Sequence, residues 1–384
     1  MAAGFSKASG GYNRRMENGG FEQSGATAGA WRAFDASANR AGEALRVIED
    51  VVRFILDDAH LTEIAKQLRH ELAAALAADG LRQRVWLRDV AGDVGVDVEA
   101  AALPRATVQD LVAANAARAG QALRSLQELS LLLAPGASGR FERLRYRLYA
   151  IERAAVGTCR AADRLRGVAL CVLVDGREDV RAFERLVESL LEAGVRMIQL
   201  RDKSLDVPAL VDRARRAVAI AARRHPEARP LVIVNDRADV AAAVNAAGAH
   251  TGAADMPLPL VRRVLGPGAV LGRTAHDLAA ARAAVLDGAD YLGVGPCFPS
   301  HTKAFASFAT PEFLAGVARE ITLPAFAIGG ITLERIDQLL ALGFGRVAVA
   351  SAVTAAADPA AAAAAFIERL DRRESKMPAR PASA

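Results

Sequence analysis

The spacing of hydrophobic residues changes once along the chain. Within residues 33–154, apolar side chains recur every three or four positions, as in NRAGEALRVIEDVVRFIL and LTEIAKQLRHELAAAL, and this spacing predicts amphipathic helices. From about Gly167 onward, short apolar runs rich in β-branched residues alternate with alanine-rich segments, which predicts strands alternating with helices. We therefore predict an all-α helical domain followed by an α/β domain.

The second half contains eight apolar runs, each followed by a helix-like segment. They are residues 168–175, 196–202, 230–236, 248–252, 269–274, 291–296, 324–330 and 346–351. Their nearly continuous apolar character is typical of parallel strands covered on both faces, and eight such units favour a (β/α)8 TIM barrel. The alternative is a doubly wound open sheet. No Gly-x-Gly-x-x-Gly follows the first run, so a dinucleotide site is not indicated.

The helical half repeats itself at an offset of 78 positions, which predicts two helical hairpins related by a pseudo-twofold. Arg40-Ala41-Gly42-x-Ala44-Leu45-Arg46 recurs as Arg118-Ala119-Gly120-x-Ala122-Leu123-Arg124. Arg69 and Arg147 share the offset. Two interpretations of the repeated arginines stay open: they bind phosphate, or they form ion pairs with Glu49, Asp50 and Glu128 inside the bundle.

These patterns predict five segments. They are a disordered leader at 1–32, the helical domain at 33–154, a linker at 155–166, the barrel at 167–372 and a flexible tail at 373–384.

Composition narrows the class of partner. The 49 basic and 44 acidic residues are spread along the chain and aromatics make up only 5%, whereas nucleic-acid binding favours a basic stripe with stacking aromatics. No apolar run reaches the length of a membrane span. Three cysteines without a Cys-x-x-Cys spacing argue against a disulfide framework and indicate a cytoplasmic location. We therefore expect small-molecule substrates, no nucleic acid and no membrane; a homo-oligomer is compatible with the sequence.

In a barrel of this type the reactive residues lie at the carboxyl ends of the strands. At the end of the second run, Gln199, Arg201 and Lys203 occupy alternate positions, so their side chains point the same way. An amide and two cations on one face suit a substrate with a polar ring and a polyphosphate. A solvated strand end is the alternative.

Asp236 ends the third run, and Asp255 follows the fourth. Two carboxylates at neighbouring strand ends can share a Mg²⁺, which usually binds substrate phosphates through one or two protein carboxylates. The alternatives are a helix N-cap at Asp236 and a turn residue at Asp255.

Later strand ends offer further phosphate partners. They are Thr274 at the end of the fifth run, then Ser300, Thr302 and Lys303 after the sixth, Gly330 at the end of the seventh, and Ala350-Ser351 at the end of the eighth. A glycine pair after the seventh strand and a small residue after the eighth match the common phosphate cradle of barrels.

These residues carry a resemblance to a known family. QLRDK, VNDRADVA, GAHTGAADMP, GADYLGVGPCFPSHTK, AIGGI and VAVASAV occur in the order and spacing of thiamine phosphate synthase, over about residues 167–370. The resemblance implies a transferase that joins 4-amino-2-methyl-5-hydroxymethylpyrimidine diphosphate to 4-methyl-5-(2-phosphoethyl)thiazole and releases pyrophosphate. A related barrel that isomerises a thiazole phosphate is the alternative, and it would need neither the paired aspartates nor the full Gln-x-Arg-x-Lys set.

The resemblance also implies roles for single residues. It implies contacts to the pyrimidine diphosphate for Gln199, Leu200, Arg201, Asp202, Lys203 and Asn235, and contacts to the diphosphate group for Thr274 and Lys303. It implies Mg²⁺ ligands at Asp236 and Asp255. On the thiazole side it implies phosphate contacts for Ser300 and Thr302 and a phosphate cradle at Gly330, Ala350 and Ser351. Arg201, Lys203 and Lys303, together with Mg²⁺, would stabilise charge on the leaving diphosphate. Ala253 and Ala254 depart from the family's usual Gln-Glu before the second aspartate.

The helical half resembles a domain fused before thiamine phosphate synthase in some bacteria, through FDASANRAGEALRVIEDVVRF, RDVAGDVG, ARAGQALRSLQEL and FERLRYRLYAIE. The resemblance implies phosphorylation of the pyrimidine monophosphate that feeds the barrel. No Gly-x-x-x-x-Gly-Lys-Ser/Thr is present, so a P-loop kinase is excluded. The alternative is a non-enzymatic dimerisation or regulatory module.

Overall fold

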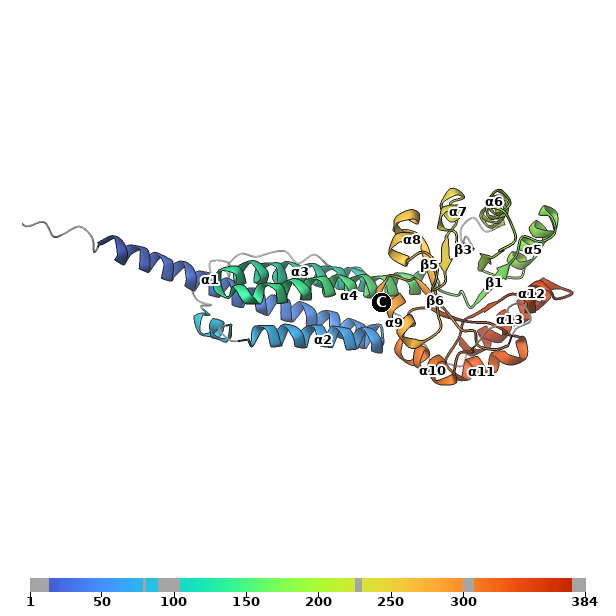
Figure 1. Ribbon diagram of the computed structural model, residues 1–384. Coiled ribbons are helices and arrows are strands. Elements are labelled where there is room, and N and C mark those ends of the chain that lie inside the picture. Colours follow the sequence, from blue (N-terminus) through green and yellow to red (C-terminus); the bar gives the residue numbers. More distant parts are fainter. Residues whose placement is uncertain (1–13, 79–80, 89–103, 225–229, 300–306, 375–384) are drawn as a thin grey trace, which may run out of the picture. The chain divides into compact units, whose positions relative to one another are not determined.

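Long helices make up the first half of the chain, as the hydrophobic spacing predicts. The computed structural model describes residues 14–78, 81–88, 104–224, 230–299 and 307–374. The helices of this half are α1 Arg14–Asp50, α2 Ala59–Leu76, α3 Val108–Leu133 and α4 Ser138–Arg164, and a π-helical turn, Val51–Ile55, extends α1 (Figure 1). The chain divides into two compact units: Met1–Glu49, Ala65–Ala106 and Ala113–Tyr149 form the first, and Asp50–Ile64, Thr107–Val112 and Ala150–Ala384 the second.

Aromatic packing and ion pairs hold the first unit together. The rings of Phe34 on α1 and Phe141 on α4 lie edge to face, 5.8 Å apart, and both side chains are fully buried. Glu49 is buried and accepts a hydrogen bond from Arg69 Nε at 2.5 Å, while Arg147 pairs with Glu71. Arg46 and Arg124 also face carboxylates, those of Glu49 and Glu128. Arg46, Arg69, Arg124 and Arg147 are therefore all ion-paired, which favours the second of the two sequence interpretations, although the partner of Arg147 is Glu71 and not one of the three expected carboxylates.

Helix α1 begins well inside the segment that the sequence predicts to be a disordered leader. It starts at Arg14, so the leader prediction is wrong for residues 14–32; residues 1–13 lie outside the described residues. The glycine- and alanine-rich composition led to the prediction. Trp31 nevertheless packs edge to face on Phe34 and is 6% exposed, which anchors this part of the helix.

Eight parallel strands form a closed barrel in sequence order, β1 to β8, which confirms the (β/α)8 prediction and rules out the open sheet. The strands are β1 Leu170–Val174, β2 Met197–Leu200, β3 Leu231–Asn235, β4 Gly248–Thr251, β5 Val270–Ala275, β6 Tyr291–Val294, β7 Ala325–Ile328 and β8 Val347–Val349. Each lies inside the apolar run that predicted it, except β5, which extends one residue beyond its run.

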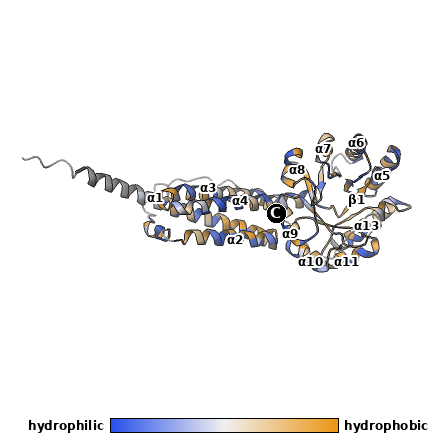
Figure 2. Cartoon of the chain, viewed as in Figure 1, coloured by the Kyte–Doolittle hydropathy of each residue, from blue (hydrophilic) through white to orange (hydrophobic). Residues whose placement is uncertain are grey.

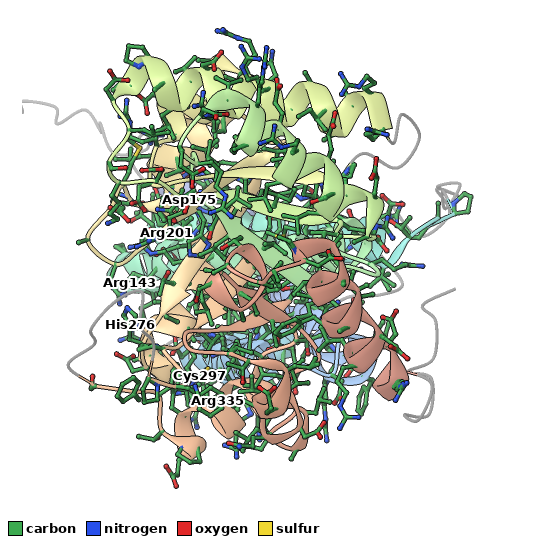
Figure 3. All side chains as sticks on the ribbon, turned by 90° about the vertical axis from the view of Figure 1, so that its right-hand side faces the viewer. Arg143, Asp175, Arg201, His276, Cys297 and Arg335 are labelled. Atoms are coloured by element: carbon green, nitrogen blue, oxygen red, sulfur yellow. The ribbon has the colours of Figure 1, made fainter. Side chains whose placement is uncertain are left out.

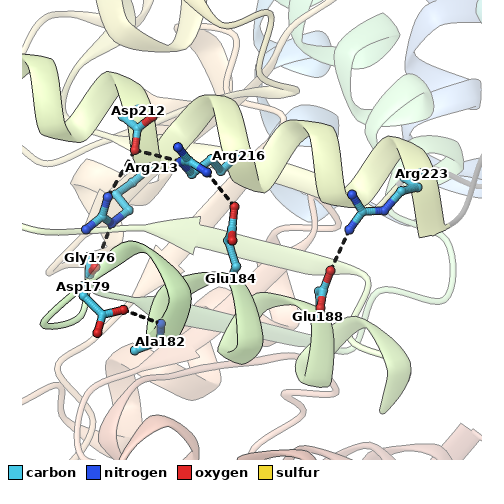
Figure 4. Close-up of polar contacts among 9 residues, drawn as sticks. All are labelled: Gly176, Asp179, Ala182, Glu184, Glu188, Asp212, Arg213, Arg216 and Arg223. Carbon is cyan, nitrogen blue, oxygen red and sulfur yellow. Dashed lines mark hydrogen bonds and ion pairs between the residues drawn. The ribbon is translucent and has the colours of Figure 1, made fainter.

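Helices surround the strands (Figure 1). They are α5 Val180–Glu192, α6 Val207–Arg224, α7 Ala238–Ala243, α8 Leu258–Leu265, α9 Leu278–Leu286, α10 Pro311–Glu320, α11 Ile336–Ala341, α12 Ser351–Thr354 and α13 Pro359–Glu374. Many of these helices carry both hydrophilic and hydrophobic residues in Figure 2, as amphipathic helices covering a sheet do. Ion pairs connect neighbouring helices on the outside: Arg216 of α6 lies 2.7 Å from Glu184 of α5, and Arg223 lies 2.6 Å from Glu188 (Figure 4).

Alternate residues of each strand fill the barrel interior. One buried cluster takes a side chain from seven strands: Cys171, Met197, Ile233, Val270, Tyr291, Phe326 and Ala348. Since strand side chains alternate between two faces, residues two positions further along also point inward. This parity directs Gln199, Asn235 and Thr274 toward the barrel axis near the carboxyl ends.

The predicted linker at 155–166 is part of the second unit's core, so that prediction is wrong. Helix α4 continues through it to Arg164, and Leu165 is fully buried in the cluster that fills the barrel. Arg160 lies 2.8 Å from the buried carboxylate of Asp290, which also pairs with Arg262 at 2.6 Å. Polar and alanine residues dominate this segment, so its composition gave no sign that its one leucine is buried.

Residues 50–64 of the second unit contact the barrel directly. Asp58 accepts hydrogen bonds from Leu61 N and Thr322 N, both at 2.8 Å. His60 Nε2 lies 3.3 Å from the carbonyl oxygen of Arg282. No helix within the described ranges is both long and apolar enough to span a bilayer.

Candidate active site

Two carboxylates and an ammonium group meet at the carboxyl ends of β3 and β4. The carboxyl groups of Asp236 and Asp255 are close enough to influence each other's protonation. Burial raises the pKa of Asp236, and the neighbouring Asp255 raises it further. Lys203 Nζ lies 3.8 Å from Asp236 Oδ2 and is largely exposed. Two neighbouring carboxylates of this kind are suited to hold a divalent cation.

The backbone at Asp236 is held in an unusual conformation. Its φ is +62°, in the left-handed region that a non-glycine residue rarely adopts. Asp236 N donates to the His250 carbonyl oxygen at 2.8 Å, and Arg237 N donates to the Asn235 carbonyl oxygen at 2.7 Å. Residue 237, not 236, is the N-cap of α7, so the N-cap alternative for Asp236 is wrong. Such strain is concentrated at functional sites.

Asp255 is fixed by its own loop. Its Oδ2 accepts a hydrogen bond from Gly252 N at 2.7 Å. Burial raises the pKa of Asp255, but the Gly252 N–H and the nearby side chains outweigh it and the pKa is lowered. Arg273 of β5 donates to Thr251 Oγ1 at 3.1 Å and to the Ala253 carbonyl oxygen at 3.3 Å. One guanidinium thus holds the loop that carries Asp255.

An imidazole lies buried between two hydroxyl groups inside the barrel. His250 Nδ1 is 3.1 Å from Tyr291 Oη, and its Nε2 is 2.8 Å from Thr274 Oγ1. Burial lowers the pKa of His250 to about 4, so the ring is neutral near pH 7. Thr274, an expected diphosphate contact, is therefore held from inside the barrel.

Asp202 organises the loops beside β1 and β2. It accepts hydrogen bonds from Gly176 N at 2.9 Å and from the Ser204 hydroxyl at 2.6 Å. Burial raises the pKa of Asp202, but these bonds and those from the Ser204 and Leu205 amides outweigh it and lower the pKa to about 2. The Gly176 carbonyl oxygen in turn accepts from the buried Arg213 Nε at 3.0 Å (Figure 4). Asp202 therefore builds the rim of the site.

The glycine pair after β7 packs against the segment that follows β6. Gly330 has a φ of +62°, and a Cβ there would lie 2.3 Å from the Pro299 carbonyl oxygen and 2.4 Å from that of Phe298. Arg335 donates to the Gly330 carbonyl oxygen at 2.6 Å and lies over the Phe298 ring. Only glycine fits at position 330. Arg335 and Cys297 are labelled in this region in Figure 3.

Comparisons with known proteins identify this constellation. The thiamine monophosphate synthase family matches residues 170–353, and the ThiD2 family matches residues 32–154. The thiamine-phosphate synthase of Rhodopirellula baltica is 40% identical over 332 residues, which cover 84% of this chain and 88% of that protein. That of a Synechocystis species is 36% identical over 342 residues, covering 89% and 96%.

The chain belongs to the thiamine-phosphate synthase family.

Members of this family are transferases of thiamine biosynthesis, as the sequence resemblance implies. Among solved structures, thiamine phosphate pyrophosphorylase from Pyrococcus furiosus is 29% identical, covers 54% of this chain and 96% of that chain, and has a TM-score of 0.47.

The barrel brings most of the expected site residues to one end. Gln199 is buried at the end of β2, and Arg201 follows with its N–H donating to the Val174 carbonyl oxygen at 2.8 Å (Figure 3). Leu200 is also buried and belongs to the opposite face of β2 from Gln199. Asn235 ends β3, while Ala350 and Ser351 join β8 to α12. Ser300, Thr302 and Lys303 lie outside the described residues, and their roles stay predictions.

The sequence reasoning gave no role to three residues that shape this thiamine-phosphate synthase site: His250, Tyr291 and Arg273. Strand parity could have found His250, because it pairs in register with Asn235. Tyr291 lies at the start of β6 and looked like core. Cys297, near the glycine pair after β7, is buried, and burial raises its pKa to about 11, so a thiolate is strongly disfavoured there at neutral pH. No group of three or more His, Cys, Asp or Glu able to hold a metal occurs among the described residues.

Proposed function

We propose that this chain condenses 4-amino-2-methyl-5-hydroxymethylpyrimidine diphosphate with 4-methyl-5-(2-phosphoethyl)thiazole, with Mg²⁺, at the carboxyl end of the barrel. The observation that carries the proposal is the meeting of Asp236, Asp255 and Lys203 at adjacent strand ends. Membership of the thiamine-phosphate synthase family supports the choice of substrates.

The pyrimidine diphosphate is assigned to the ends of β2 and β3. The amides of Gln199 and Asn235 offer both donors and acceptors to a polar aminopyrimidine ring. Arg201 and Lys203 follow the end of β2 and would face the diphosphate. A cation that meets the leaving group lowers the barrier only if it interacts more strongly as negative charge develops.

Mg²⁺ is assigned to Asp236 and Asp255. The two carboxyl groups influence each other's protonation, the donors are hard oxygens, and a phosphate-bound Mg²⁺ needs only one or two protein carboxylates. When bound there, Mg²⁺ would supply positive charge to the diphosphate oxygens. Arg273 and the Gly252 N–H hold Asp255 in place.

The chain's own part in the reaction is positioning and charge stabilisation. As the C–O bond breaks, the diphosphate gains negative charge next to Arg201 and Lys203, and the aminopyrimidine carries positive charge on its methylene. The thiazole nitrogen then forms the C–N bond, so no protein nucleophile is required. Fixing two bound partners in line removes much of the entropic barrier.

The thiazole phosphate is assigned to the opposite side of the barrel mouth. Gly330, Ala350 and Ser351 follow β7 and β8, where barrels commonly bind phosphate through backbone N–H groups. The resemblance adds Ser300, Thr302 and Lys303 to this side, with Lys303 reaching the diphosphate.

An assay with the full chain tests the proposal. The protein, both substrates and Mg²⁺ should yield thiamine phosphate, identified by mass. Absence of thiamine phosphate above the enzyme-free background contradicts the proposal. Conversion of the thiazole phosphate to an isomer, without consumption of the diphosphate, would favour the tautomerase-like alternative.

We propose in addition that the helical domain phosphorylates the pyrimidine monophosphate. The match of residues 32–154 to the ThiD2 family supports this, as does the buried carboxylate of Asp35, to which Arg88 Nε, of the first residue of the RDVAGDVG motif, donates at 2.7 Å. Supplying the full chain with pyrimidine monophosphate, ATP and thiazole phosphate tests it. Thiamine phosphate formation from the diphosphate but not from the monophosphate would favour a non-enzymatic module.

A cytoplasmic location completes the proposal. All three cysteines are buried and free, which suits a reducing compartment.

A further inference from the structure

Three polar side chains form one row inside the barrel, next to its apolar core. Tyr291 of β6, His250 of β4 and Thr274 of β5 are linked by contacts of 3.1 Å and 2.8 Å. Tyr291 is 3% exposed and His250 6% exposed, whereas Thr274 is only half-buried, near the end of its strand. The row therefore runs from the closed core of the barrel toward the site.

Two glycines make room for this row. A Cβ at Gly272 would lie 2.2 Å from Tyr291 Cζ and 2.3 Å from His250 Nδ1, and a Cβ at Gly293 would lie 3.1 Å from His250 Cε1. Neighbouring inward positions thus have no side chain, and the imidazole and phenol occupy that space. Glycine weakens a strand, so the barrel loses intrinsic strand stability to accommodate the pair.

Hydrogen-bond accounting gives the row a direction. Within the part of the chain that the structure describes, the Tyr291 hydroxyl has one hydrogen-bond partner, His250 Nδ1. A buried phenol must donate its proton to something, so Tyr291 Oη donates and Nδ1 accepts. The proton of the imidazole then lies on Nε2, which donates to Thr274 Oγ1. With its oxygen accepting this bond, the Thr274 hydroxyl turns its own proton away from His250.

We propose that Tyr291, His250 and Thr274 form a directed hydrogen-bond chain, in which His250 is a positioning residue that aims the Thr274 hydroxyl proton at the anionic diphosphate of the substrate. This rests on the proposed function for the nature of the substrate. The His250 backbone adds a second link to the site, because its carbonyl oxygen accepts from Asp236 N. A single residue of β4 thus positions a group at each of two neighbouring strand ends.

A double-mutant cycle separates this role from simple core packing. Tyr291→Phe keeps the ring and removes only the donor. It should lower kcat/KM for the pyrimidine diphosphate about tenfold, as loss of one oriented hydrogen bond does. In a Thr274→Val background, the same change should lower kcat/KM less than about twofold, since no hydroxyl remains to be oriented. In a Thr274→Ser background, which keeps the hydroxyl, the full effect should return.

If Tyr291→Phe lowers kcat/KM by the same factor in the wild-type and Thr274→Val backgrounds, the proposal is overturned, because a packing effect does not depend on the Thr274 hydroxyl. Tyr146→Phe, at an exposed position on α4, is the matched control and should leave the rate unchanged. Thermal unfolding of each variant checks that all remain folded.

A measurement without turnover tests the direction of the chain. In histidine-labelled protein, ¹⁵N NMR should show His250 protonated at Nε2 and not at Nδ1, with the signal assigned by its change in Tyr291→Phe. A proton on Nδ1 would overturn the proposal even in an active enzyme. This NMR measurement can be made even if the enzyme makes no thiamine phosphate. Failure of the proposed function is therefore distinguishable from failure of the proposed hydrogen-bond chain.

Discussion

Asp236 combines three features at one residue: a left-handed backbone, a carboxyl whose pKa is raised by burial and by Asp255, and an ammonium group at 3.8 Å. Helix capping explains none of them, since the N-cap of α7 is the next residue. Such a combination is expected where a backbone is held under strain to present a ligand.

Replacing Asp236 by alanine should lower turnover by orders of magnitude, because the diphosphate would lose the cation held beside it. Circular dichroism and thermal unfolding should be close to wild type. The matched control is Asp239→Ala, three residues along, where the carboxylate is exposed and pairs with Arg237. Equal activity of the two variants at limiting Mg²⁺ would remove Asp236 from the metal site.

The low pKa of Asp202 predicts how the stability of the fold depends on pH. The pKa of Asp202 is about 2 in the folded chain, against an ordinary value of 3.8. The stabilisation that the Asp202 carboxylate gives to the fold is therefore fully present above pH 3.8 and is lost as the pH falls toward 2. Asp202→Ala should therefore lower the urea midpoint at pH 6, and the difference from wild type should narrow below about pH 4. A difference that stays constant down to pH 3 would show that the carboxylate charge is not responsible.

At the scale of elements, each strand and loop could be predicted to a different extent. All eight strands were predictable, because parallel strands buried on both faces are continuous apolar runs. The strand ends then identified Gln199, Asn235, Asp236 and Asp255. Contacts between strands were not predictable: nothing local in the sequence shows that Gly272 leaves space for the His250 and Tyr291 rings.

The loop after β7 gives a prediction at this scale. Gly330→Ala forces a Cβ into the Phe298 and Pro299 carbonyl oxygens at a positive φ. It should lower the melting temperature and raise KM for the thiazole phosphate more than KM for the pyrimidine diphosphate. Gly268→Ala is the control, since a Cβ there meets nothing within 4 Å. Equal effects on both KM values would contradict the assignment of this loop to the thiazole phosphate.

At the scale of the whole molecule, the boundary between the halves differs from the prediction. A change of hydrophobic period locates where strands begin, but it cannot show that the end of a preceding helix enters the core of the following domain. Leu165 does so, and Arg160 reaches the buried Asp290. Residues 50–64 and 150–166 belong structurally with the barrel.

Two fragments test this boundary. Residues 150–384 retain Leu165 and Arg160, whereas residues 167–384 lose both. Removing a buried leucine costs about 3 kcal/mol, so the shorter fragment should melt about 10 °C lower. Equal melting temperatures in differential scanning calorimetry would show that the helix end is dispensable to the barrel.

The most direct test of the account follows both products of one reaction. Full-length protein with the pyrimidine diphosphate, the thiazole phosphate and Mg²⁺ should release pyrophosphate and thiamine phosphate in equal amounts throughout the time course. Pyrophosphate without thiamine phosphate, or neither product, would contradict the claim that this barrel mouth expels the diphosphate and aligns the thiazole nitrogen to replace it.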